Sequence, residues 1–149
     1  MLRRHFFRHA LGLALMPAGA ALLSACSKFD PMPLKDGESE CPVCRMKITA
    51  RPFAAQIRDK AGTYHFFDDF GCAVHWIKAQ QVPEHELTFW IIDYKGGYWI
   101  DARRAVYMQG PESPHGFNLA ASTIPKTGDL DYDAAKAIAL ARPAPVPVQ

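Results

Sequence analysis

The first 26 residues restrict what this chain of 149 residues can fold into, because they have the pattern of a segment that joins no core. Three arginines, Arg3, Arg4 and Arg8, make this start positive, and the stretch from Ala10 to Leu23 is apolar and uncharged. A membrane-spanning helix needs roughly 20 such residues, and this stretch is shorter. A basic start followed by a short apolar stretch predicts an export signal over residues 1–25 that is removed from the mature protein.

The end of this signal, Leu23-Ser24-Ala25-Cys26, resembles the lipobox of bacterial lipoproteins. The resemblance implies cleavage before Cys26 and a diacylglycerol on its thiol, whereas a plain secretory signal that ends in a cysteine is the alternative. Lipid chains contribute roughly 0.8 kcal/mol per buried methylene, so two or three of them would anchor the protein firmly. By similarity to Gram-negative lipoproteins, Ser27 implies the outer membrane and hence a periplasmic domain. Arg3-Arg4 also resembles a twin-arginine signal, which leaves the export route open.

Charge and composition exclude two classes of protein. Without residues 1–25, the chain keeps 14 basic and 15 acidic residues, a net charge of −1. This balance gives no electrostatic reason to bind nucleic acid. A hydrophobic content of 49% is sufficient for a core and excludes a chain that is disordered throughout.

The remaining chain is expected to hold one compact α+β domain at residues 41–125. The polar, proline-containing residues 26–40 predict a tether between the lipid anchor and this domain. Residues 126–149 are expected to form a short helix and an extended proline-rich tail. Turn residues and apolar patterns predict strands at 53–58, 63–67, 87–93 and 98–100, with 103–108 extending the same sheet.

Two helices are expected. The first begins at Asp68 or Asp69, where a carboxylate can cap the helix, and runs to about Gln81. Spacings of four and three place its apolar residues on one face, which we expect to be buried: Phe70, Val74 and Ile77. The second runs over 134–142 and is capped by Asp131 or Asp133.

Beyond Cys26 the chain has three cysteines, an odd number for an exported protein. A disulfide between Cys41 and Cys44 would leave Cys72 as a buried thiol. Alternatively, the three cysteines and His75 have the spacing C-x2-C-x27-C-x2-H, which resembles a ribbon or treble-clef zinc site and predicts a structural zinc-binding interaction module. The C-P-V-C sequence also fits a thiol–disulfide oxidoreductase, but no strand–helix unit of the thioredoxin type surrounds it.

Met46 favours copper as a third interpretation. The thiolate of Cys44 and the thioether of Met46 lie two residues apart, so both can reach one ion from a single turn. Both donors are soft, and soft donors favour Cu(I). Because transfer of the ion needs a low coordination number and access for a partner, we expect this turn to be exposed. The alternative is that Met46 is a core residue.

Three segments of the sequence resemble the NosL family: Cys41-Pro42-Val43-Cys44-Arg45-Met46, Phe66-Phe67-Asp68-Asp69-Phe70-Gly71-Cys72 and Ser113-Pro114-His115-Gly116. The resemblance covers roughly residues 38–125 and the lipoprotein signal. It implies a fold of two ββα-type units related to treble-clef and organomercurial-lyase-like domains.

The resemblance also implies a function. Members of this family are copper-binding lipoproteins that assist the assembly of nitrous oxide reductase. This chain would carry Cu(I) in the periplasm to an ABC-transporter-associated complex, which builds the copper–sulfide centre of the reductase. No nucleophile triad, phosphate-binding loop or paired-carboxylate motif stands out in the sequence, so an enzyme is not expected.

Carried over residue by residue, the resemblance implies that Cys44 and Met46 are copper ligands. His115 lies in a loop where relatives often have Met followed by Gly, and we expect it to be the third ligand, with Cys41 as a further candidate. Arg45 replaces a glycine that is usual in the family, which would restrict the backbone if the turn needs a positive φ.

Four residues are assigned more open roles. Asp68 and Asp69 are expected to provide a helix cap and an acceptor next to the metal ligands, or simply a solvated helix start. Cys72 and His75 are three residues apart on one helix face, so they could complete a metal site. Cys72 could equally be a small buried apolar residue.

Overall fold

A computed structural model describes residues 30–147 of the chain. The predicted signal at residues 1–25 and the lipidation site Cys26 lie outside this range and remain predictions. Between residues 30 and 147, no helix is both long and apolar enough to cross a membrane.

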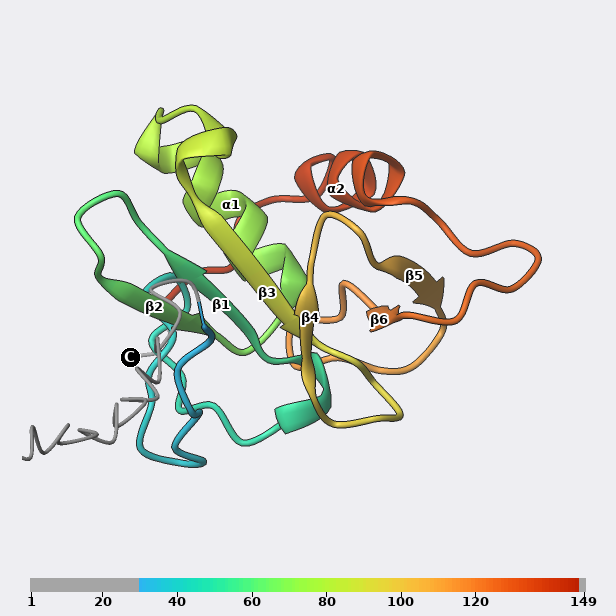
Figure 1. The fold of residues 1–149 in the computed structure, drawn as a ribbon, viewed down its shortest axis with the longest axis horizontal. Helices are drawn as coiled ribbons and strands as arrows, with labels where there is room; N and C mark the ends of the chain where they lie inside the picture. The colour runs from blue at the N-terminus through green and yellow to red at the C-terminus, as the bar shows by residue number, and fades with distance from the viewer. Residues whose placement is uncertain (1–29, 148–149) are drawn as a thin grey trace, which may run out of the picture.

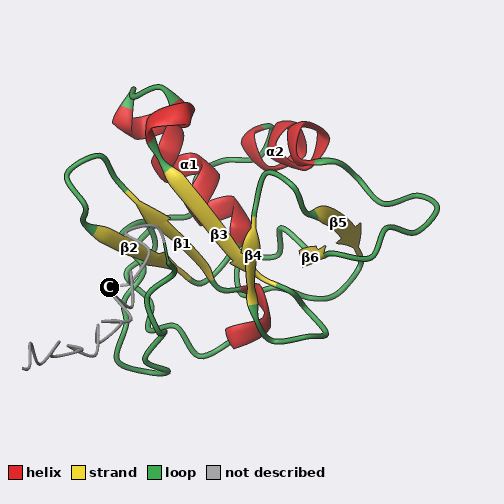
Figure 2. Cartoon of the chain, viewed as in Figure 1, coloured by secondary structure: helices red, strands yellow, loops and turns green. Residues whose placement is uncertain are grey.

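Four antiparallel strands form the main sheet in the order β2-β1-β3-β4 (Figure 1). Their bounds are Ala55–Arg58 for β1, Tyr64–Phe67 for β2, Thr88–Ile92 for β3 and Trp99–Asp101 for β4. Helix α1, Phe70–Gln80, follows β2 and lies against one face of this sheet (Figure 2). Hairpin β1–β2 and α1 form a ββα unit, and two short 3-10 helices, Arg51–Phe53 and Glu84–Glu86, precede β1 and β3.

A second, two-stranded sheet pairs β5, Val106–Gln109, with β6, Leu119–Ser122, and helix α2, Tyr132–Leu140, follows it. The α+β class is therefore confirmed. The prediction that 103–108 extends the first sheet was wrong. A turn at the end of β4, in which Asp101 accepts hydrogen bonds from the backbone N–H groups of Arg103 and Arg104, leads the chain out of that sheet before β5 begins.

The main core lies between the sheet and α1, and strand alternation explains it. Ile57, Phe89 and Ile91 point from the sheet to the side on which Phe70 and Val74 are buried. The predicted apolar face of α1 is thus confirmed. Helix α2 contributes Tyr132, Ala135 and Ala139 to the same core, so the compact domain continues beyond residue 125.

The opposite face of the sheet is covered by the segment that precedes β1. Leu34 and Ile48 are buried there against Ala54 and Ile92. The buried amide of Gln56 exchanges two hydrogen bonds with the backbone of Met32, at 2.7 and 2.8 Å. Residues 30–40, expected to belong to a tether, therefore pack on the domain.

Caps decide where both helices begin. The carboxylate of Asp69 accepts a hydrogen bond from the backbone N–H of Gly71, and that of Asp131 accepts one from Ala134. Of the two aspartates expected at each start, Asp69 caps α1 and Asp131 caps α2, whereas Asp68 remains available for other contacts.

Gly71 allows the loop before β6 to pack against the start of α1. A Cβ at residue 71 would lie 2.2 Å from Cδ2 of the buried Phe117 ring. We expect Gly71→Ala to lower the free energy of unfolding by about 1–3 kcal/mol, because the ring must move out of a packed core. Urea unfolding measures this, and combining Gly71→Ala with Phe117→Leu should cost less than the sum of the single changes. Additive losses would contradict the steric cause.

Candidate metal centre

The first part of the site is a tight turn at residues 41–46. The backbone N–H of Cys41 donates to the carbonyl of Met46 at 2.9 Å, and the N–H of Arg45 donates to the carbonyl of Cys41 at 2.9 Å. Arg45 has φ of 67°, the left-handed conformation that favours glycine. Its guanidinium contacts Glu40, with Nε 2.9 Å from Oε1. The turn therefore needs a positive φ at residue 45, and here an arginine adopts it.

The second part is the junction between β2 and α1, which contains Asp68, Asp69 and Cys72. Asp69 has φ of −152° and ψ of 147°, so the chain stays extended up to the helix start. Consecutive side chains of an extended chain point to opposite sides. Both carboxylates are buried, with exposed fractions of 1% and 0%, and Cys72 lies in the first turn of α1.

The turn and the junction bring four possible metal ligands together. One ligand atom from each of Cys41, Cys44, Asp68 and Cys72 lies within 4.8 Å of every other, and all four residues are buried. The thiol of Cys44 donates to both carboxylate oxygens of Asp68, at Sγ–O distances of 3.3 and 3.4 Å. Three sulfurs and one carboxylate thus converge on one point in the interior.

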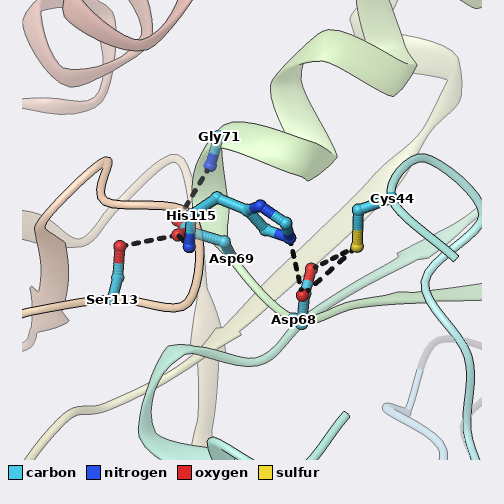
Figure 3. A network of polar contacts seen from close by, with 6 residues as sticks. All are labelled: Cys44, Asp68, Asp69, Gly71, Ser113 and His115. Carbon is cyan, nitrogen blue, oxygen red and sulfur yellow. Dashed lines mark hydrogen bonds and ion pairs between the residues drawn. The ribbon is translucent and has the colours of Figure 1, made fainter. Parts of the chain in front are cut away.

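His115 reaches the cluster from the loop between β5 and β6. Its Nε2 lies 3.1 Å from Oδ2 of Asp68, and its side chain is 15% exposed. In Figure 3, His115 and Cys44 approach Asp68 from opposite sides. His115 therefore lies at the more accessible edge of the centre, whereas the three thiols are fully buried.

Hydrogen bonds and burial shift the pKa values of the three thiols. The bond between Cys72 and Cys41 raises the pKa of the Cys72 thiol, which burial raises further. The same bond holds the pKa of Cys41 below its usual range, although burial opposes this. Burial also raises the pKa of Cys44, as do the nearby charges of Cys41 and Asp68. Of the three, Cys41 is therefore the favoured thiolate.

The structure brings together most, but not all, of the residues that the sequence singled out. Cys41, Cys44, Asp68, Cys72 and the adjacent His115 meet at the centre. Met46 is partly buried and packs against the core cluster that contains Cys41 and Cys44. The three cysteines are free thiols, so no disulfide joins Cys41 to Cys44.

His75 lies elsewhere. Its Nε2 is 3.2 Å from the carbonyl oxygen of Ala139 in α2, and its ring packs near Phe117. The predicted zinc set of three cysteines and one histidine is thus replaced by three cysteines and Asp68. A side chain three residues beyond Cys72 shares its helix face, but Asp68 approaches the sulfurs from the end of β2.

The expectation that the 41–46 turn is exposed holds for two of its residues but not for Cys44 itself. Cys44 has an exposed fraction of 0%, because its side chain turns into the core and donates to Asp68. The exposed residues of the turn are Pro42 and Arg45. The role of Ser113, which hydrogen-bonds Asp69, was not predicted, although the sequence around His115 pointed to this loop.

Comparison with known proteins adds one structural neighbour. No family model matches the chain, and no curated protein matches it in sequence. The crystal structure of the copper chaperone NosL from Shewanella denitrificans is similar, with a TM-score of 0.49 and 17% identity over 72% of this chain and 84% of that chain. The neighbour bears the name of the family that the sequence motifs resemble.

Burial of the cysteines predicts slow chemistry at their sulfurs. In a Cys26→Ser variant without metal, we expect little reaction of Cys41, Cys44 and Cys72 with a thiol reagent in the native state, because all three are 0% exposed. All three thiols should react after unfolding in guanidinium. An Ellman titration before and after unfolding measures this, and three thiols that react at once in the native protein would contradict the closed cluster.

Proposed function

We propose that this protein binds Cu(I) as a carrier and is not an enzyme. The observation that carries the proposal is that three thiols and Asp68 lie within 4.8 Å of one another, next to His115. Two of the thiols, Cys41 and Cys44, belong to the turn that holds Met46. Thiolates and thioethers are soft donors, and imidazole is also acceptable to copper. Cys44, Met46, His115 and Cys41 are the proposed ligands, and Cys72 lies close enough to add a third thiolate.

The two ends of the site have different accessibility, which suits a carried ion. The sulfurs of Cys41, Cys44 and Cys72 are buried, whereas Met46 and His115 are partly exposed. His115 also lines a hollow of about 470 Å³ with Phe117, Arg142 and the tail that follows it. A partner protein would therefore contact the site at Met46 and His115. Ligand exchange can begin there before the buried thiolates release the copper ion.

We propose that the carrier works on the periplasmic side of the outer membrane, held by lipid on Cys26. The recipient proposed from the sequence resemblance is the ABC-transporter-associated complex that assembles the copper–sulfide centre of nitrous oxide reductase. The signal pattern and the three motif segments support these two points.

A structural zinc site is the second candidate, and the burial of the cluster favours it. Structural zinc is held by four protein ligands in a closed site, and three cysteines with one carboxylate offer four donors. A closed site of this kind would make the domain a metal-stabilised interaction module.

Replacing either member of the proposed sulfur pair tests the copper proposal. We expect Cys44→Ser and Met46→Ala each to weaken Cu(I) binding by about tenfold or more, equivalent to about 1.4 kcal/mol, while the circular dichroism of the domain is retained. Competition with a Cu(I) chelator under anaerobic conditions measures this. Met32→Ala is the matched control, since Met32 is 46% exposed and lies outside the turn. Unchanged Cu(I) affinity in both site variants would show that Cys44 and Met46 are not copper ligands.

Metal analysis separates the two candidates. A Cu(I) carrier should bind one copper per chain after anaerobic reduction, and its domain should stay folded when the copper is removed. A structural zinc domain should be purified with one zinc per chain and should unfold when a chelator removes it, because the metal contributes folding free energy. Thermal melting with and without chelator, beside the metal content, decides between these outcomes.

A further inference from the structure

Asp69 connects the start of α1 to the loop that carries His115. One carboxylate oxygen, Oδ1, accepts from the backbone N–H of Gly71 at 3.2 Å and so caps the helix. The other, Oδ2, accepts from the hydroxyl of Ser113 at 2.6 Å and from the backbone N–H of His115 at 3.2 Å. Figure 3 shows this carboxylate between the helix start and the loop. A helix cap alone would need only the first of these bonds.

The loop is ordered around the same contact. The Ser113 hydroxyl also accepts from the backbone N–H of Asn118 at 2.9 Å, and the backbone N–H of Ser113 donates to the Asn118 side chain at 3.1 Å. The N–H of Gly116 donates to the Ser113 carbonyl at 2.9 Å, and Arg142 donates to the Gly116 carbonyl. Ser113 is therefore the point at which the internal bonds of the loop meet the bond to Asp69.

The bond to the His115 backbone fixes where the imidazole lies. Asp69 holds the main chain of His115, and Asp68, its neighbour in sequence, holds the Nε2 of the same residue at 3.1 Å. Two adjacent carboxylates thus hydrogen-bond the same histidine, one at its backbone N–H and the other at its imidazole. The Asp69 side chain is itself 0% exposed, so water does not compete for these bonds.

We propose that Asp69 is a positioning residue that holds His115 in place as a metal donor. The inference rests on the proposed Cu(I) function and adds to it the residue that sets the geometry of the imidazole. Without the hydrogen bonds to Oδ2, ordering His115 when the ion binds would cost conformational entropy. Partners that orient metal ligands typically contribute about 10- to 100-fold in metal affinity.

Asp69→Asn tests the proposal because it separates the two roles of the side chain. Asparagine is as good a helix cap as aspartate, so the bond to Gly71 can remain. When the amide oxygen keeps the bond to Gly71, the amide NH2 takes the place of Oδ2. This group is a donor only, so it cannot accept from Ser113 or from the N–H of His115. Ser113→Ala, the second variant, removes one of the two bonds to Oδ2 and leaves the carboxylate in place, although it also removes the bond from the Asn118 N–H.

The matched control is Asp131→Asn, which makes the same substitution at the N-cap of α2, where the carboxylate accepts from Ala134 at 2.8 Å. Cu(I) affinity would be measured by anaerobic chelator competition for the wild type, the control, Asp69→Asn, Ser113→Ala, His115→Ala and the double variant Asp69→Asn/His115→Ala. X-ray absorption at the copper edge would report whether an imidazole is bound, and urea unfolding would report stability.

We expect Asp69→Asn to lower Cu(I) affinity by about 10- to 100-fold, with the imidazole signal lost and the sulfur signal kept. The Ser113→Ala loss should be smaller, and Asp131→Asn should leave affinity unchanged. In the His115→Ala background, Asp69→Asn should cause no further loss.

Four results would overturn the inference. Equal losses from Asp69→Asn with and without His115 would show a general structural role. A wild-type affinity or imidazole signal in Asp69→Asn would show that the loop needs no such hold. If the wild type binds Cu(I) tightly and His115→Ala does not weaken the binding, His115 is not a donor, but the proposed carrier function is unaffected. If the wild type binds no Cu(I), both the role of Asp69 and the carrier function are contradicted.

Discussion

The site depends on two neighbouring carboxylates that point in opposite directions. The chain leaves β2 still extended, so Asp68 faces Cys44 while Asp69 faces the loop at Ser113 (Figure 3). One residue later the helix begins, and Cys72 comes round in its first turn. A change of register by one residue at this junction would point Asp68 away from the thiols and remove their acceptor. The strand-to-helix geometry therefore fixes the positions of both the donors and the loop.

Burial and hydrogen bonding keep this polar centre compatible with a core. Among the described residues, no buried side-chain nitrogen or oxygen lacks a hydrogen-bond partner. Burial raises the pKa of Asp69, and the bonds from Ser113, His115 and Gly71 counter that rise. A buried polar group without such partners costs about 1–3 kcal/mol, so the network is a requirement of the fold as well as of the site.

Local patterns in the sequence predicted the α+β class, the apolar face of α1 and the turn that holds Cys44, because these depend on nearby residues. They also singled out Cys41, Cys72 and Asp68, whereas His115 came from the family resemblance. They could not show that the side chain of Cys44 turns inward, or that Asp68 takes the place expected for His75, since both depend on how β2 and the 41–46 turn pack. The pairing of β5 with β6 was missed because it follows from a turn at Asp101 that redirects the chain.

The donors come from three stretches, at residues 41–46, 68–72 and 115, that only the completed fold brings together. A peptide with the sequence of the first stretch alone would offer two thiols and a thioether without the carboxylate or the imidazole. An unfolded chain likewise lacks the complete set of donors. The set forms only after the loop at residue 115 has docked against the other two stretches.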